Sequence, residues 1–254
     1  MKTRYHLLDN LRGITLISMI FYHAMWDIVY IFGVDAPWYR TEGAYIWQQS
    51  ICWTFILLSG FCWSLGKKHL KRGLTVFGLA WIITAVTLVL MPENKIVFGV
   101  LCLLGSAMLL MIPLDKLFRK INPYMGIVIT FVLFLFTKRV PDGYLGVGDW
   151  QLLQLPRTWY ANSFTAYLGF PHTLFTSTDY FPILPWFFLF VTGYFLYHIW
   201  KRCNKSSLLE MRGVASLAFI GRHSLIIYAL HQPVVYGVLY LWFEIASQIL
   251  TFTP

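Results

Sequence analysis

Long apolar segments with few charged residues recur along the whole of this 254-residue chain. An α-helix needs roughly 20 such residues to cross a bilayer. We therefore predict an all-α integral membrane protein, a polytopic bundle of seven transmembrane helices, with spans at residues 13–34, 43–66, 73–92, 96–114, 121–137, 180–197 and 224–243. The apolar stretch 213–220 is interpreted as a surface helix before the last span, and counting it as a crossing would give eight spans.

Composition supports this interpretation, because 58% of the residues are hydrophobic and only 12% are charged. A soluble domain of this length carries more charge on its surface. The chain is expected to form one transmembrane domain over residues 1–254, with a long external loop at 138–179. The four cysteines have no metal-binding spacing, and we predict no metal site.

Basic residues predict the orientation of the bundle. Most of them fall at the N-terminus or in alternate connections: Lys2, Arg4, Arg12, Lys67, Lys68, Lys71, Arg72, Lys116, Arg119, Lys120, Lys201, Arg202, Lys205, Arg212 and Arg222. By the positive-inside rule this side, and with it the N-terminus, is cytoplasmic. The net charge of +9 is then explained by topology and contact with anionic lipids rather than by nucleic-acid binding.

Ionisable residues inside the first span are the strongest functional signal. Arg12 and His23 are eleven residues apart, close to three helical turns, so they share one helix face, and Asp27 lies one turn beyond His23. Such residues cost about 2.5–3.5 kcal/mol each at mid-membrane, so a function is the default interpretation. His23 is the candidate general base. The alternatives are a structural polar stripe, and an Arg12 that only extends to the interface.

A second group of polar residues opens the last span. Arg222 lies at the predicted cytoplasmic edge, Ser224 fits a helix N-cap, and His231 follows seven residues later on the same face. His23 and His231 would then face one cavity. The alternative is that His231 and Gln232 only form hydrogen bonds to neighbouring helices.

Two further sites are candidates at the ends of the bundle. Asp179 lies at the predicted external mouth, where it would hold an acceptor hydroxyl or amine, or cap a helix. On the predicted cytoplasmic face, Lys68 and Arg72 belong to a basic loop that suits an anionic cofactor. The aromatic residues of loop 138–179 suit a sugar ring or a lipid headgroup, or an interfacial belt.

Four sequence blocks resemble a known family. LLDNLRGITLISMIFYH is similar to the opening of the transmembrane acyltransferase superfamily, which is marked by Arg, ten residues and then His. The blocks KRGLTVFGLAWIITAVTLVLMPENKIVFGVL, STDYFPILPWF and GRHSLIIYALHQPV resemble, in order, small bacterial membrane proteins grouped with the heparan-α-glucosaminide N-acetyltransferase catalytic domain. Related sequences tend to carry His where this chain has Cys102, and the active histidine of the lysosomal enzyme lies in a segment that this chain does not match.

The resemblance implies transfer of an acetyl or acyl group from cytoplasmic acyl-coenzyme A to an amine or hydroxyl of an extracytoplasmic sugar or glycan. It implies roles for Arg12 and Arg222 beside coenzyme A and for His23 and His231 in catalysis. A multi-pass protein of the bacterial cytoplasmic membrane, in contact with membrane lipids and compatible with a homodimer, is expected. The alternatives are a non-enzymatic carrier or permease, in which the same residues relay protons, and a structural membrane subunit.

Overall fold

The computed structural model describes residues 5–203 and 213–252, with side chains up to residue 245. The basic residues Lys2, Arg4, Lys205 and Arg212 lie outside the described residues. The chain divides into two compact units, one made of Met1–Phe55 with Lys205–Pro254 and the other of Ile56–Asn204. Each unit is described by itself below, and the helix α2 (Glu42–Trp63) runs from the first into the second.

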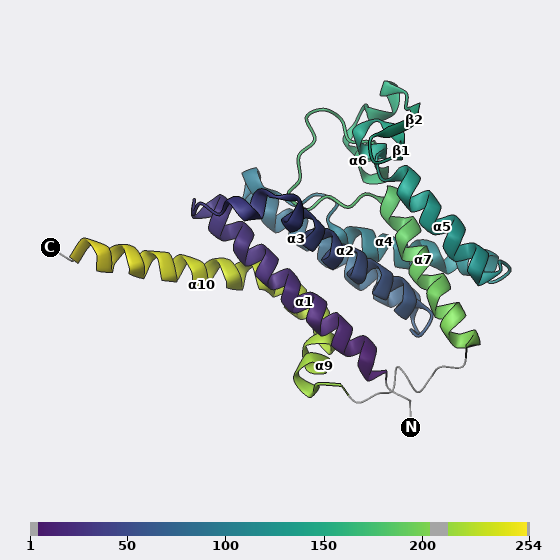
Figure 1. The fold of residues 1–254 in the computed structure, drawn as a ribbon, viewed down its shortest axis with the longest axis horizontal. Helices are drawn as coiled ribbons and strands as arrows, with labels where there is room; N and C mark the ends of the chain where they lie inside the picture. Colours follow the sequence, from purple (N-terminus) through teal and green to yellow (C-terminus); the bar gives the residue numbers. More distant parts are fainter. Residues whose placement is uncertain (1–4, 204–212, 253–254) are drawn as a thin grey trace. The chain divides into compact units, whose positions relative to one another are not determined.

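The first unit is built on the N-terminal helix (Figure 1). Its elements are α1 (His6–Trp26), the π-helical turn η1 (Asp27–Ile31), the 3-10 turn η2 (Pro37–Arg40), the first part of α2, α9 (Ala215–Arg222) and α10 (Ser224–Phe252). Leu16 and Met19 of α1 and Ile51 of α2 form a small buried core. The Tyr39 hydroxyl donates to the backbone oxygen of Tyr22 at 2.8 Å, which ties η2 to α1.

Two glycines bring α1 and α9 into backbone contact. A Cβ placed on Gly13 would lie 2.2 Å from the carbonyl oxygen of Leu217, and one on Gly221 would lie 1.9 Å from that of Asp9. Both distances are far below van der Waals contact. The two helices therefore pack this closely only because neither position carries a side chain.

The helices of the second unit pack against one another in pairs. Its elements are the end of α2, α3 (His69–Leu90), η3 (Pro92–Asn94), α4 (Val100–Phe118), α5 (Pro123–Thr137), η4 (Val140–Asp142), β1 (Tyr144–Val147), β2 (Trp150–Gln154), η5 (Arg157–Tyr160), α6 (Ser163–Leu168) and α7 (Ile183–Arg202). α3 packs against α4, and α5 against α7. The buried hydroxyls of Thr130 and Thr192 form a hydrogen bond between α5 and α7 at 2.9 Å.

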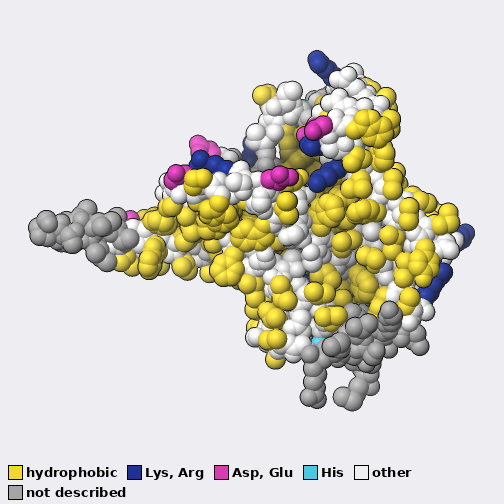
Figure 2. Space-filling view, in the orientation of Figure 1, with side chains coloured by type: hydrophobic (Ala, Val, Ile, Leu, Met, Phe, Trp, Pro, Cys, Tyr) yellow, Lys and Arg dark blue, Asp and Glu magenta, His cyan; other side chains and the backbone are white. Residues whose placement is uncertain are grey.

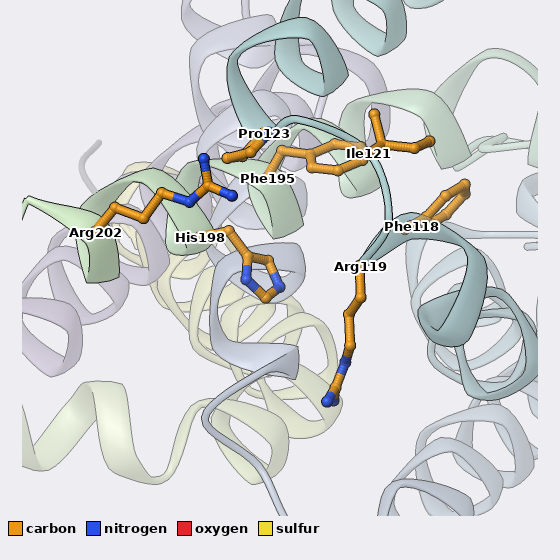
Figure 3. Close-up of a pocket in the computed structure, with 7 residues that line it drawn as sticks. All are labelled: Phe118, Arg119, Ile121, Pro123, Phe195, His198 and Arg202. Atoms are coloured by element: carbon orange, nitrogen blue, oxygen red, sulfur yellow. The ribbon is translucent and has the colours of Figure 1, made fainter.

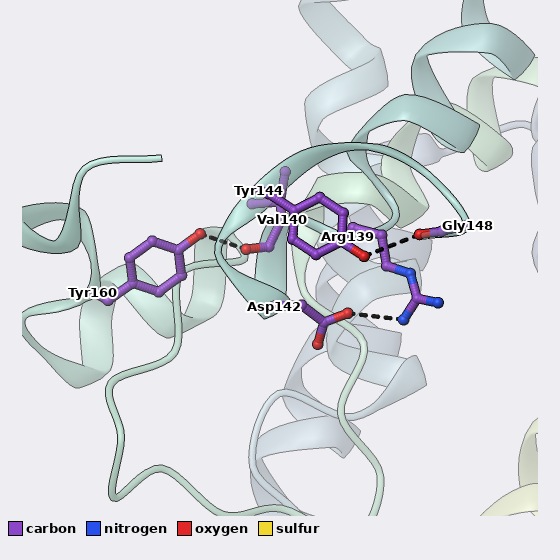
Figure 4. Close-up of polar contacts among 6 residues, drawn as sticks. All are labelled: Arg139, Val140, Asp142, Tyr144, Gly148 and Tyr160. Atoms are coloured by element: carbon purple, nitrogen blue, oxygen red, sulfur yellow. Dashed lines mark hydrogen bonds and ion pairs between the residues drawn. The ribbon is translucent and has the colours of Figure 1, made fainter. Parts of the chain in front are cut away.

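The segment 138–179 has its own folded structure. β1 and β2 form an antiparallel hairpin that turns at Gly148, a glycine with a φ of +59°. The Tyr144 hydroxyl donates to the Gly148 oxygen, the Tyr160 hydroxyl to the Val140 oxygen, and Arg139 pairs with Asp142 (Figure 4). The loop expected from the sequence is therefore a small folded subdomain with a two-stranded sheet.

The predicted class of all-α multi-pass membrane protein is confirmed. Among the described residues, six helices are long and apolar enough to cross a membrane: His6–Ile31, His69–Leu90, Val100–Phe118, Pro123–Asp142, Ile183–Arg202 and Ser224–Ile245. Figure 2 shows hydrophobic side chains over the described length of α10 and over much of α5.

The remaining predicted span, at residues 43–66, corresponds to α2. It has 22 residues but is less apolar, because its first half carries Gln48, Gln49 and Ser50, and its crossing stays a prediction. α9 has only 8 residues, or about 12 Å, and is too short for the eighth span.

Candidate functional site

Two histidines from opposite ends of the chain meet in the first unit. His23 comes from the last turn of α1 and His231 from the second turn of α10, and their ring centroids lie 4.9 Å apart at an interplanar angle of 62°. The sequence expectation that the first and last spans bring these two side chains together agrees with this geometry. The edge of one imidazole faces the other ring, and both rings are largely shielded from solvent.

Asp27 and Gln232 form a second link between the same two helices. The Gln232 amide Nε2 donates to Oδ1 of Asp27 at 2.7 Å, and the Asp27 side chain is completely buried. Among the described residues, neither Oδ2 of Asp27 nor Oε1 of Gln232 has a hydrogen-bond partner. An unsatisfied buried oxygen costs about 1–3 kcal/mol, so these two atoms call for a partner such as water or a bound ligand.

The tautomer of His231 follows from its backbone contact. Its Nδ1 lies 2.5 Å from the carbonyl oxygen of Tyr228, and since a carbonyl only accepts, Nδ1 must carry the hydrogen. In the neutral ring Nε2 is then a lone-pair acceptor. This atom is buried and has no hydrogen-bond partner in the described part of the chain. His231 therefore presents a lone-pair nitrogen that no described residue uses.

A π-helical turn places Asp27. α1 ends at Trp26, and residues 27–31 continue in wider turns, with the backbone N–H of Phe32 donating to the carbonyl of Asp27. A π-turn inserts one residue into the helical register and often occurs at functional sites. Here it marks the point where the carboxylate turns toward α10.

The two arginines flank the crossing of α1 and α9. Arg12 precedes Gly13 and forms an ion pair with Asp9 at 3.8 Å, whereas Arg222 follows Gly221, is exposed, and lies over the Phe219 ring. Because both glycines belong to the same backbone contact, the main chain places Arg12 and Arg222 on neighbouring turns.

Ser224 lies just beyond this crossing. It is the first residue of α10, and the carbonyl of the preceding residue, His223, accepts from the N–H of Ile227. The expected cap position is thus one residue earlier than the sequence indicated.

The remaining predicted site residues belong to the second unit. Oδ2 of Asp179 accepts a 3.0 Å hydrogen bond from the backbone N–H of Val100, so this carboxylate caps α4, the alternative that the sequence left open. Lys68 precedes α3 in a left-handed conformation. Arg72, in the first turn of α3, lines a small cleft together with Trp63, His69 and Met108.

Sequence reasoning underestimated Gln232 and missed Tyr228. Gln232 was considered only as a helix–helix contact, yet it holds the carboxylate that was predicted to be functional. A carboxylate inside the membrane, such as that of Asp27, needs a polar partner, and this need could have pointed to Gln232. The carbonyl of Tyr228 leaves no signal in the sequence, because any residue three positions before His231 has one.

Comparison with known proteins gives one match. The family model of the heparan-α-glucosaminide N-acetyltransferase catalytic domain matches residues 4–233, a range that contains both histidines, Asp27 and Gln232. No curated protein and no solved structure matches the chain. Because the matched range covers most of its length, the chain belongs to the family of the heparan-α-glucosaminide N-acetyltransferase catalytic domain.

Proposed function

We propose that this protein is a membrane acetyltransferase that uses acetyl-coenzyme A and modifies an amine or hydroxyl of an extracytoplasmic sugar or glycan. Membership of the family supports the reaction class. The observation that carries the site is the contact between His23 and His231, with Asp27 and Gln232 beside them. A bacterial inner-membrane location and a homodimer stay predictions.

In this proposal the histidine pair handles the proton of the acceptor. Attack of an amine or hydroxyl on an acyl group requires a base near neutral pH, and imidazole is the usual one. His23 is the proposed base, and Nε2 of His231, which has no partner among the described residues, would receive the proton or orient the acceptor. The Gln232 hydrogen bond fixes Asp27 one helical turn from His23.

The residues present fit acetyl-coenzyme A in two respects. Acetyl-coenzyme A supplies an activated acetyl thioester when it is bound. The unpartnered Nε2 of His231 and Oδ2 of Asp27 are buried polar atoms that need a ligand or water. Arg12 of α1 and Arg222, the last residue of α9, flank the crossing of these helices and would pair with phosphate groups, and Ser224 follows Arg222 by two residues.

The remaining predicted site residues belong to the second unit. Roles for Lys68 and Arg72 in binding cofactor phosphates stay predictions. A role for Asp179 in holding the acceptor stays a prediction and would use Oδ1, since Oδ2 already caps α4. In the segment 138–179 the exposed Trp150 and Trp159 offer aromatic faces of the kind that pack on sugar rings.

Acetyl transfer by the purified protein tests the proposal. The wild-type protein in lipid nanodiscs is supplied with radiolabelled acetyl-coenzyme A and glucosamine, and acetylated product and free thiol are measured. We expect both to appear together, and to be lost in the variant H23A/H231A. If the wild type releases no thiol with any amino sugar or hydroxyl acceptor, while a vesicle assay detects proton flux, the carrier hypothesis replaces this one.

A further inference from the structure

A basic cleft in the second unit is lined by none of the residues assigned so far. It has a cavity volume of about 50 Å³ and is formed where α4 ends, α5 begins and α7 ends (Figure 3). Its lining residues are of two kinds, apolar and basic: Phe118, Arg119, Ile121, Pro123, Phe195, His198 and Arg202. Such a combination suits an amphiphile with an anionic head.

The basic side chains are arranged around one buried nitrogen. Figure 3 shows the His198 ring between Arg202 and Arg119, on the wall of the cleft. Nε2 of His198 is buried and has no hydrogen-bond partner among the described residues. A neutral imidazole with its hydrogen on Nε2 would donate to a ligand oxygen there, which satisfies this atom.

One carboxylate lies near the cleft but is already engaged. Oδ2 of Asp115 pairs with Arg119 at 2.7 Å, and Oδ1 accepts from the Tyr194 hydroxyl, also at 2.7 Å. Arg202 forms no ion pair with a described residue. The Asp115 carboxylate is therefore already used by Arg119 and Tyr194, and the charge of Arg202 is left for an anion to balance.

The position of the cleft favours a lipid over a soluble anion. It opens at the helix ends that carry the basic connections, the side predicted to be cytoplasmic, where anionic phospholipids are concentrated. Its other wall is made of Phe118, Ile121 and Phe195, which a free phosphate ion could not use but an acyl chain could cover.

We propose that this cleft is a specific site for the phosphate group of an anionic phospholipid, held by Arg202, His198 and Arg119 with an acyl chain against Phe118 and Phe195. The site does not depend on the acetyl-transfer proposal, since none of its lining residues has a role in that proposal. Such a site would hold one lipid headgroup at a defined position, in addition to the general attraction of basic residues to an anionic membrane surface.

Native mass spectrometry of the full chain tests this site. The probe is dioleoylphosphatidylglycerol, titrated into protein released from detergent micelles, with dioleoylphosphatidylcholine as the uncharged comparison. For the wild type we expect a single retained phosphatidylglycerol and no retained phosphatidylcholine. Arg202→Gln and His198→Leu should each weaken retention roughly tenfold, because each removes a hydrogen bond to a charged group.

Lys201→Gln is the matched control. It removes the same charge from the same helix end but does not line the cleft, so retention should stay within about twofold of the wild type, as only screened surface charge is lost. Equal loss in Lys201→Gln and Arg202→Gln would overturn the proposal, because general surface charge would then explain binding. Unchanged retention in Arg202→Gln would overturn it as well.

Two competitors separate the sources of phosphate. Inorganic phosphate and acetyl-coenzyme A, each at millimolar concentration, should fail to displace the retained lipid. If inorganic phosphate displaces it and binds alone, the site is one for free phosphate, and the lipid assignment is wrong. If acetyl-coenzyme A displaces it, and Arg202→Gln weakens acetyl-coenzyme A binding, the cleft belongs to the donor. His23→Ala should retain phosphatidylglycerol like the wild type, whatever its acetyl-transfer activity.

Discussion

The amide of Gln232 donates a 2.7 Å hydrogen bond to the completely buried carboxylate of Asp27, joining the last long helix to the first. A buried carboxylate left without its donor costs more than the bond itself contributes. The Asp27–Gln232 contact is therefore both a connection between helices and a condition for placing Asp27 beside His23.

This relationship predicts strong coupling between the two positions. Gln232→Leu should lower the free energy of unfolding by about 1–3 kcal/mol, since it leaves Asp27 buried and unpaired. Adding Asp27→Leu should restore part of that loss, giving a coupling energy of about 0.5–3 kcal/mol in a double-mutant cycle. Denaturant or thermal unfolding of the four proteins in one detergent measures it. Strictly additive effects would show that the hydrogen bond contributes nothing.

The histidine pair predicts the largest effects on catalysis. His23→Ala should lower acetyl transfer by about 10²–10⁴-fold, the usual contribution of a general base, with acetyl-coenzyme A affinity nearly unchanged. His231→Ala should have a smaller effect if it orients the acceptor. His6→Ala, which changes a histidine at the start of the same helix, is the control. Near-normal turnover in His23→Ala, with a severe defect in His231→Ala, would assign the base to His231.

The glycines at the crossing of α1 and α9 predict a steric effect. Gly221→Ala places a Cβ within 1.9 Å of the Asp9 oxygen, and it should cost about 1–3 kcal/mol as the helices separate. It should also weaken acetyl-coenzyme A binding if Arg12 and Arg222 act together. Gly237→Ala in α10 is the control, because nothing lies within 4 Å of its Cβ, and it should be neutral or stabilise by up to about 1 kcal/mol. Thermal unfolding and calorimetric titration check both variants.

Alkaline pH should destabilise the subdomain at 138–179. Burial, and secondarily the nearby Asp142, raises the pKa of the Tyr160 phenol above its usual value. The folded state therefore binds this proton more tightly, so the stabilisation is complete below about pH 10, the unfolded pKa, and is lost as the pH rises through the folded pKa. Tyr160→Phe should cost about 1 kcal/mol at neutral pH by losing the bond to Val140, and should reduce the alkaline dependence. Tyr144→Phe is the matched control, and an equal alkaline dependence in Tyr160→Phe and wild type would contradict the assignment.

Labelling of introduced cysteines tests the predicted orientation in the membrane. In a background with Cys203 replaced by Ser, Lys67→Cys and Asp149→Cys each introduce an exposed thiol. Intact cells treated with a membrane-impermeant maleimide should label position 149 and not position 67, as the positive-inside rule requires. The reverse pattern would invert the topology and move the proposed donor side to the outside.

The sequence predicted the helices better than their ends. Apolar length alone located α1, but its start at His6 was placed seven residues late, because Arg12 was taken as a boundary and instead lies within the helix, paired with Asp9. α4 begins at Val100 rather than at residue 96, since Phe98 adopts a positive φ and Asp179 caps the helix from far along the chain. Such a tertiary cap has no local sequence signal.

In the hairpin and in the site, too, local features could be predicted from the sequence and tertiary contacts could not. Gly143 and Gly148 adopt a positive φ, which glycine tolerates in turns, but the alternation of β1 and β2 is too short to predict a sheet. Helical spacing placed His231 on a polar face and suggested its meeting with His23. The partner of Asp27 and the tautomer of His231 depend on how α10 packs against α1, and spacing within one helix contains no information about that packing.

The backbone contact at Gly13 and Gly221 also determines when the proposed anion site is assembled. With α1 and α9 in van der Waals contact through their main chains, the Cα atoms of Arg12 and Arg222 are fixed during folding, before any ligand arrives. An anion that binds there orders two side chains only, and no helix has to move, so the entropic penalty of binding is small. Near this site, Gly13 and Gly221 should therefore tolerate substitution least. Arg12 and Arg222 can be replaced without disturbing the backbone contact, and a replacement there would change which ligand binds.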